Sequence, residues 1–301
     1  IAARIRKLPE SEYAYPEGSA GPLAVPTDPL FSISQWNLQR GVGGVNLPPA
    51  WDLTTGKNTL VVAVIDSGII KTHPEFTGRL LAGYDFIADA TRSNDGGGRD
   101  SFSDDPGDWV TQAETNAGGV FAGCKARNST WHGTGTASVI AANANNAKGI
   151  AGVDWNVKIL PVRVLGKCVG GNSYVDGDLM DAIRWAAGIT ISGIANPNPA
   201  KVINISLGRS STCAPALQSA IDAARKKGAI VVAAVGNDES TLLTSPANCQ
   251  RVVRVAATTR QGGLASYSNR GELASLSAPG GEDKDPLDQL SIASDLGTTP
   301  P

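Results

Sequence analysis

The sequence is poor in several residues on which whole classes of function depend. Its 301 residues include only two histidines, four cysteines and one methionine, and 26 Lys and Arg nearly balance 28 Asp and Glu. Two histidines are too few for a histidine-based metal cage, and the lack of a basic excess leaves no electrostatic footprint for a nucleic-acid partner. No apolar run reaches the length that crosses a bilayer. These absences point away from nucleic-acid binding and membrane insertion.

What is present is typical of a folded, loop-rich protein. Hydrophobic residues make up 41% of the chain and charged residues 18%, a balance that excludes disorder for most of it. The 35 glycines are well above the average share, which suits long surface loops that carry function.

Alternating strand and helix patterns predict the fold class. Continuous β-branched runs, typical of strands buried on both faces of a parallel sheet, occur at residues 59–65, 157–164, 202–206, 229–235 and 252–257. Helical patterns lie between them, at residues 134–142, 176–187 and 214–227. This order predicts a three-layer α/β fold with a mostly parallel central sheet flanked by helices. Residues 1 to about 50 contain seven prolines and are predicted to be irregular.

Polar residues follow several of the predicted strands, where ligands bind in open parallel sheets. Asp66 lies at such an end, and three roles are open for it from its position alone. It could bind a metal or a phosphate, cap the next segment or orient a histidine. Asn237 follows another strand through Gly236, and its amide fits either an oxyanion donor or a left-handed turn. Residues Ser206-Leu207-Gly208 fit a plain strand end or an edge with which an extended peptide pairs.

The two histidines differ in their surroundings. His73 begins a turn before Pro74, which favours a structural role. His132 starts a helix of small residues, where backbones approach closely and the imidazole can face a cleft. His132 is therefore the candidate for acid–base chemistry.

Four ordered motifs, together with two shorter segments, resemble the subtilisin-like serine peptidases (subtilases), over about residues 27–294. The four are Val64-Ile65-Asp66-Ser67-Gly68-Ile69, His132-Gly133-Thr134, Asn204-Ile205-Ser206-Leu207-Gly208 and Ala234-Val235-Gly236-Asn237, and the two are Thr27-Asp28-Pro29-Leu30-Phe31 and His73-Pro74-Glu75-Phe76. Each motif is weak alone, but their order at the predicted strand and helix ends makes the resemblance specific. It implies a subtilisin-like α/β fold and an enzyme that hydrolyses peptide bonds in polypeptides.

The resemblance also implies a role for each matching residue. Asp66 would hold the tautomer of the imidazole, and His132 would act first as general base and then as general acid. Asn237 would stabilise the tetrahedral oxyanion. Ser206, Leu207, Gly208 and Gly236 would bind the substrate as an added strand.

The family's nucleophile motif is missing. The family carries its serine in Gly-Thr-Ser-Met-Ala, and the one methionine of this chain is Met180, in Asp178-Leu179-Met180-Asp181. We therefore expect the chain to be incomplete before the nucleophile and inactive and poorly folded alone. The alternative is a non-catalytic, degenerate subtilase that binds peptides. A nucleotide-binding α/β protein has little support, because Asp66 lacks the second carboxylate or P-loop lysine that such sites need.

The beginning of the chain resembles the end of a subtilase prosegment. Residues 12–17, Glu-Tyr-Ala-Tyr-Pro-Glu, are similar to the last strand of the inhibitory propeptide. The predicted organisation is a prosegment tail or linker over residues 1–26 and a subtilisin-like peptidase domain, incomplete at its C-terminus, over residues 27–301. A disordered arm is the rival interpretation of residues 1–26. The chain's own propeptide and polypeptide substrates are the expected partners of a monomer.

The four cysteines show no Cys-x-x-Cys spacing, and their number is even. In a chain that resembles a secreted peptidase they favour disulfides over metal ligation, with three pairings open. The resemblance to secreted bacterial subtilases implies Cys124–Cys168 and Cys213–Cys249 and an extracellular location. A cytosolic protein would instead carry four reduced thiols.

Carboxylates concentrate in the glycine-rich stretch from residue 94 to 108. Like charges at this density repel unless a cation or solvent intervenes, and calcium prefers flexible oxygen ligands. Because subtilases often carry calcium, we expect a structural calcium ion on Asp95, Asp100 and Asp108. A solvated acidic loop is the alternative. A second acidic group, Asp176, Asp178 and Asp181, lies at the beginning of a predicted helix. The helix dipole stabilises negative charge there even without a metal ion.

Overall fold

One sheet runs through the centre of the computed structural model, which describes residues 24–168, 174–271 and 273–282. Its strands are β1 (Val61–Asp66), β2 (Tyr84–Asp85), β3 (Lys158–Arg163), β4 (Val202–Ile205), β5 (Ile230–Ala234), β6 (Val253–Thr258) and β7 (Leu276–Pro279). Within the described residues they lie in the order β2-β3-β1-β4-β5-β6-β7, and every neighbouring pair is parallel.

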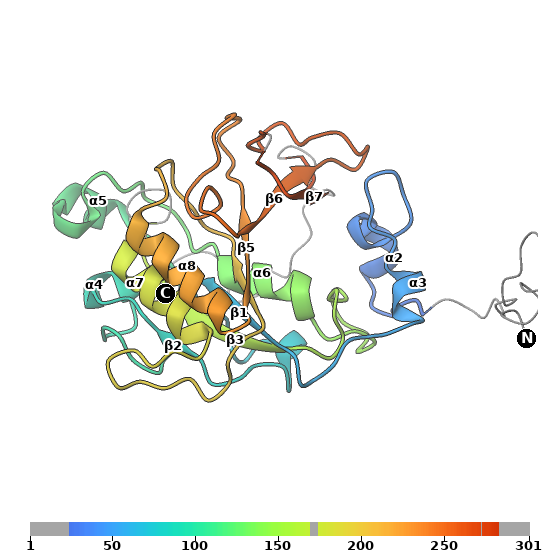
Figure 1. Cartoon of the computed structure of the whole chain (residues 1–301), viewed down its shortest axis with the longest axis horizontal. Helices are drawn as coiled ribbons and strands as arrows, with labels where there is room; N and C mark the ends of the chain where they lie inside the picture. Colours follow the sequence, from blue (N-terminus) through green and yellow to red (C-terminus); the bar gives the residue numbers. More distant parts are fainter. Residues whose placement is uncertain (1–23, 169–173, 272, 283–301) are drawn as a thin grey trace, which may run out of the picture.

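Helices cover both faces of this sheet (Figure 1). Helices α7 (Asp176–Ala186) and α8 (Pro215–Lys226) pack together on one face, and α6 (His132–Ala141) lies on the other. The apolar stripe of α7 and α8 and the inward side chains of the strands form the largest hydrophobic cluster. The predicted three-layer α/β fold with a parallel sheet is thus confirmed.

The predicted sheet and helix patterns missed the shortest elements. Strand β2 has two residues, too few to show a period, and β7 has four residues and includes a proline. The region predicted to be irregular contains short helical segments, namely α2 (Phe31–Ser34), a 3-10 turn (Trp36–Leu38) and α3 (Pro48–Trp51). Proline does not prevent α3, because it occupies the first helical positions, where no backbone donor is needed. The prediction of a prosegment tail falls mainly on residues 1–23, outside the described residues.

Both disulfides implied by the resemblance are formed. Cys124 pairs with Cys168, and Cys213 pairs with Cys249. The first lies in a small apolar cluster with Val110. In the described ranges, no helix combines the length and the apolar character that a membrane crossing requires.

The strand order places a topological switch at β1. From β1 the chain runs through β2 to β3 on one side, and it continues with β4 on the other side. At such a point the loops that leave neighbouring strands diverge and open a crevice at the carboxyl edge of the sheet. Asp66 is the last residue of β1 and therefore lies at this edge.

The packing of α7 on the sheet yields a stability prediction. Ile183 is fully buried in the largest cluster, so Ile183→Ala should lower the free energy of unfolding by about 2–5 kcal/mol through lost contacts and a cavity. Ile33→Ala, at a side chain that is 73% exposed, is the matched control and should change it by less than about 0.5 kcal/mol. Denaturant unfolding measures both, and equal effects would contradict the packing described.

Candidate active site

The end of β1 meets the beginning of α6 in a hydrogen-bonded pair. His132 Nδ1 lies 2.7 Å from Asp66 Oδ1, with the carboxylate almost fully buried and the imidazole 42% exposed. Asp66 Oδ1 also accepts a hydrogen bond from the backbone N–H of Ser67 at 2.8 Å. With Nδ1–H directed to the carboxylate, Nε2 is the ring nitrogen left for proton exchange.

The electrostatics of this pair favour the imidazolium form. The negative charge of Asp66 raises the pKa of His132 to about 9, against the opposing effect of burial, and the charges of Asp108 and Asp105 act in the same direction as Asp66. His132 is therefore protonated at neutral pH and becomes a base only as the pH approaches this value.

Glycine allows the two elements to come so close. A Cβ atom on Gly133 would stand 2.1 Å from the backbone oxygen of Gly68 and 3.1 Å from Cβ of Asp66. Trp131, just before the helix, has a positive φ of 51°, which turns the chain into α6. The absence of a side chain at Gly133 therefore allows the start of α6 to pack directly against the end of β1.

The predicted substrate-binding residues gather beside the same edge. A cavity of about 390 Å³ is lined by Ser206, Leu207, Gly208, Gly236 and Asn237, among others. A second cavity, of about 540 Å³, touches Ser206, Gly236 and Asn237 again and extends between α6 and strands β4 to β7. The structure thus brings together the residues after β4 and those after β5, along the helix that His132 begins.

A buried asparagine that no motif indicated shapes this region. Asn269 is fully buried; its Oδ1 accepts from the backbone of Asp238 and Ser240, and its Nδ2 donates to carbonyls of Val235 and Leu242. It therefore fixes the loop that presents Asn237. It lies far along the chain in a segment with no strand or helix signal, so the sequence offered nothing by which to find it.

The three aspartates predicted to bind calcium serve three separate purposes. Asp95 is paired with Arg163 at 2.8 Å, and Asp100 accepts from the backbone of Phe102. Asp108 accepts from the N–H and hydroxyl of Thr130 at 2.6 and 2.8 Å. Across residues 24–168, 174–271 and 273–282, no group of three or more His, Cys, Asp or Glu is placed to hold a metal ion. These three residues do not fit a shared calcium site.

The second acidic group is likewise bound by arginines. Arg99 contacts Asp178 at 2.6 Å and Asp181 at 2.7 Å, and Arg209 pairs with Asp176. These carboxylates hold the start of α7 against neighbouring loops.

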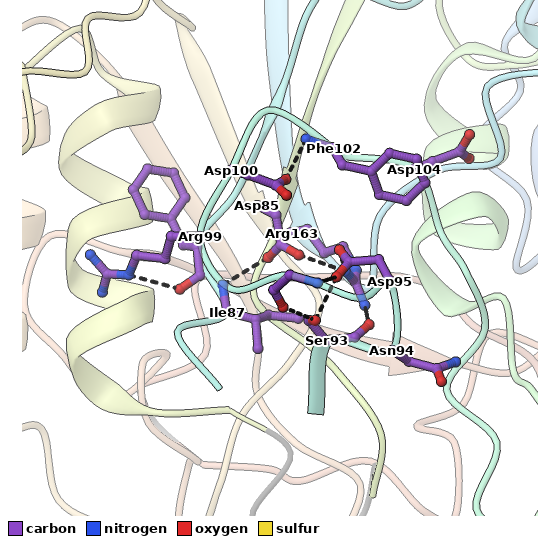
Figure 2. A network of polar contacts seen from close by, with 12 residues as sticks. Asp85, Ile87, Ser93, Asn94, Asp95, Arg99, Asp100, Phe102, Asp104 and Arg163 are labelled. Carbon is purple, nitrogen blue, oxygen red and sulfur yellow. Dashed lines mark hydrogen bonds and ion pairs between the residues drawn. The ribbon is translucent and has the colours of Figure 1, made fainter. Parts of the chain in front are cut away.

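The guanidinium of Arg163 lies between two carboxylates, Asp85 and Asp95, in the position that a metal ion would need to occupy to neutralise them (Figure 2). Arg163 is 1% exposed, lies opposite Asp66 in the register of β1 and β3, and its NH1 contacts Asp85 at 2.5 Å as well as Asp95. Its Nε donates to the carbonyl of Ser67 at 3.0 Å. Burial raises the pKa of Asp85 to about 8, so at neutral pH one proton and one guanidinium balance the two carboxylates. The cluster is therefore close to neutral.

A different pair of carboxylates has an unsatisfied oxygen. Glu75 and Asp28 are both buried, and Asn146 connects them, with Nδ2 donating to Glu75 at 2.8 Å and its backbone N–H donating to Asp28 at 3.3 Å. Glu75 Oε1 is buried without a hydrogen-bond partner among the described residues. Burial, with a further contribution from Asp28, raises the pKa of Glu75 to about 6. The buried Glu75 Oε1 is therefore a free oxygen acceptor of the kind that a hard cation such as calcium takes as a ligand.

Fold and site together define an α/β protein with an acid–base pair at the switch point of a parallel sheet. A sequence model described as the subtilase family matches residues 57–300, and the chain belongs to that family. It is 50% identical to the "Extracellular protease" of Xanthomonas campestris pv. campestris over 85% of this chain and 42% of that protein. It is 40% identical to the "Extracellular basic protease" of Dichelobacter nodosus over 92% of this chain and 45% of that protein. The chain thus spans less than half the length of these two relatives.

A solved structure gives the same result. A protease from Pseudoalteromonas arctica superimposes with a TM-score of 0.84 at 44% identity, covering 92% of this chain and 80% of that one. The subtilisin-like fold and the family that the sequence motifs indicated are both confirmed.

The Arg163 cluster generates a stability prediction. Arg163→Met should lower the free energy of unfolding by about 3–5 kcal/mol, because it leaves the buried carboxylate of Asp95 without its guanidinium partner and removes a hydrogen-bond partner of Asp85. Arg184→Met is the matched control: its ion pair with Asp181, on the surface of α7, has a distance of 3.9 Å and should contribute less than about 1 kcal/mol. Chemical denaturation of both variants decides the point, and a small loss for Arg163→Met would refute a structural role for this cluster.

Proposed function

We propose that this chain belongs to the catalytic domain of a serine endopeptidase that hydrolyses peptide bonds in polypeptides. The observation that carries the proposal is the hydrogen-bonded pair of Asp66 and His132 at the switch point of the sheet. Membership of the subtilase family supports it independently.

Each residue has a step in the proposed reaction. His132 Nε2 takes the hydroxyl proton of a serine as its Oγ attacks the scissile carbonyl carbon, and Asp66 stabilises the imidazolium that forms. The amide of Asn237 donates to the oxyanion of the tetrahedral intermediate. The imidazolium then gives its proton to the leaving amine, and water releases the acyl group by the same steps. Residues Ser206–Gly208, with Gly236, pair with the extended substrate.

The motif in which the family carries its nucleophilic serine, Gly-Thr-Ser-Met-Ala, does not occur in the 301 residues. The proposed activity therefore requires a Gly-Thr-Ser-Met-Ala segment or a close variant in the protein. A second candidate function is a non-catalytic subtilase that binds peptides along Ser206–Gly208, and the cavity of about 390 Å³ that these residues line supports it.

Sequencing the gene past the codon for Pro301 separates the two candidates. The peptidase requires the serine segment within a few tens of codons. An immediate stop codon would exclude the triad and leave the peptide-binding function to be tested.

We further propose that the protein acts outside the cell as a monomer. Two disulfides are typical of oxidising compartments, and two relatives are named extracellular. Residues 1–26 are proposed to be the tail of a prosegment whose inhibitory part is the domain's own partner. Mass spectrometry of the secreted protein tests this, since the mature N-terminus should fall between residues 15 and 27.

The pH dependence of peptidase activity provides a prediction for the whole protein. Since His132 must lose a proton to act as a base, kcat/KM should rise with pH toward a midpoint near 9. Asp66→Asn should lower kcat by about 10⁴-fold and move the midpoint to lower pH, because the charge that holds the proton is gone. Asp222→Asn, on α8, is the control and should alter neither. An unchanged profile in Asp66→Asn would contradict the assigned roles.

We also propose that calcium binds at Glu75 and Asp28 rather than in the acidic stretch, with Asn146 beside both carboxylates. When bound, the ion would neutralise two buried negative charges and give Glu75 Oε1 a partner. It takes no part in the reaction.

A calorimetric comparison tests the calcium site. Calcium should raise the melting temperature of the wild-type protein, and Glu75→Gln should abolish that response. Because the raised pKa of Glu75 means that its stabilising, protonated form is lost as pH rises through about 6, Glu75→Gln without calcium at pH 8 should gain about 2 kcal/mol. Asp100→Asn is the control and should retain the response. Loss of the response in Asp100→Asn alone would return the site to the acidic stretch.

A further inference from the structure

Ser67, the residue after Asp66, is a buried junction of four hydrogen bonds. It is 1% exposed, its N–H donates to Asp66 Oδ1, and its carbonyl accepts from Arg163 Nε. Its hydroxyl donates to Asp105 Oδ2 at 2.7 Å and accepts from the backbone N–H of Gly133 at 2.9 Å. One side chain therefore connects the end of β1, the start of α6 and the loop that carries Asp105.

Helix α6 depends on this contact for a cap. A helix leaves its first backbone N–H groups without partners, and a side chain just before the helix normally accepts from one of them. The residue in that position here is Trp131, which makes no side-chain cap hydrogen bond. The acceptor for Gly133 N–H comes instead from Ser67, on a different element. The cap and the Asp66–His132 pair are thus adjacent and share the same two elements.

Asp105 determines which way the serine hydroxyl points. Its Oδ1 accepts from Gly107 N–H at 2.9 Å and its Oδ2 accepts from the serine, so both oxygens serve as acceptors. With its hydrogen held by Asp105, the hydroxyl has only lone pairs to offer Gly133. Burial raises the pKa of Asp105 to about 6, and the group is therefore a carboxylate at the alkaline pH at which His132 loses its proton. Asp108, on the same loop, accepts a hydrogen bond from the backbone N–H of Thr130, two residues before His132.

We infer that Ser67, oriented by Asp105, is a positioning residue that sets the geometry of the Asp66–His132 pair by capping α6 from outside the helix. The inference rests on the proposed function for its catalytic consequence, but the geometry that it concerns exists in the folded chain without substrate. Charged groups that face His132 are Asp66, Asp105 and Asp108.

Histidine NMR of the full-length protein tests this directly, with the signal of His132 assigned by its loss in His132→Gln. His73 and His132 are the two histidines of these 301 residues. In ¹⁵N-histidine-labelled protein, Ser67→Ala removes the cap without removing a charge. It should lower the pKa of His132 by about one unit or more, as the pair loosens, and weaken the downfield signal of Nδ1–H. Ser67→Thr keeps the hydroxyl and should restore both.

Matched controls separate positioning from general damage. Ser103→Ala removes a buried hydroxyl without a described partner, from the loop that carries Asp105, and should leave His132 unchanged. The signal of His73 should not move in any variant. A folded Ser67→Ala protein with the wild-type His132 pKa and Nδ1–H signal would overturn the inference.

Asp105→Asn carries the same test if Ser67→Ala does not fold. An asparagine has one acceptor oxygen, which the N–H of Gly107 occupies, and its amide group then donates to the serine. The serine hydrogen loses the acceptor that fixes the orientation of the hydroxyl, so the Nδ1–H signal of His132 should weaken. Asp104→Asn removes a neighbouring charge without touching the serine and should preserve that signal. Equal signals in the two variants would refute the orienting role of Asp105.

Hydrolysis kinetics distinguish this inference from the proposed function. If the full-length protein is a peptidase, Ser67→Ala should lower kcat roughly 10- to 100-fold with KM nearly unchanged, since orientation rather than binding is lost. A wild-type protein without peptidase activity would refute the proposed function, while the NMR result would still decide the role of Ser67.

Discussion

The close approach of a strand end to a helix start is the constraint on which the rest of this site depends. The Asp66–His132 hydrogen bond exists because Gly133 permits α6 to touch the turn after β1. With any side chain at that position the elements would separate and the imidazole would lose its carboxylate. The helix start then needs a hydrogen-bond acceptor from outside, and Ser67 supplies it. Four residues, Asp66, Ser67, His132 and Gly133, thus provide the close approach, the helix cap and the Asp–His hydrogen bond together.

Buried charge is the second organising feature. The loops on the β2 side of the sheet carry many carboxylates, and two arginines contact four of the aspartates there or on α7. Arg163 lies between Asp85 and Asp95, and Arg99 holds two aspartates of α7. Since an unpaired buried charge is costly, Arg163 fixes the loop that carries Asp95 to β3, the strand beside the strand of Asp66, and Arg99 fixes its own loop to α7. By contrast, Glu75 Oε1 is buried without a hydrogen-bond partner among the residues that the structure describes.

Much of the fold was predictable, because long buried strands and amphipathic helices leave clear periods in a sequence. Residues 202–206 and 176–187 were predicted within one residue or two of β4 and α7. Strand β2 was missed because two residues show no period, and β7 because its Leu-Ser-Ala-Pro sequence resembles a turn. The calcium prediction rested on a count of carboxylates, and such a count cannot show that a distant arginine, Arg163, lies among them.

The fold class, the family and the two ends that carry the Asp66–His132 pair were predictable from the sequence, because short motifs at strand and helix ends are local features of the chain. Which charges meet and which donors are capped could be learned only from the folded molecule. Ser67 and Asp105 are 38 residues apart, and Asn269 is 31 residues from Asp238. Contacts of this kind depend on how elements pack, and no spacing along the chain records them.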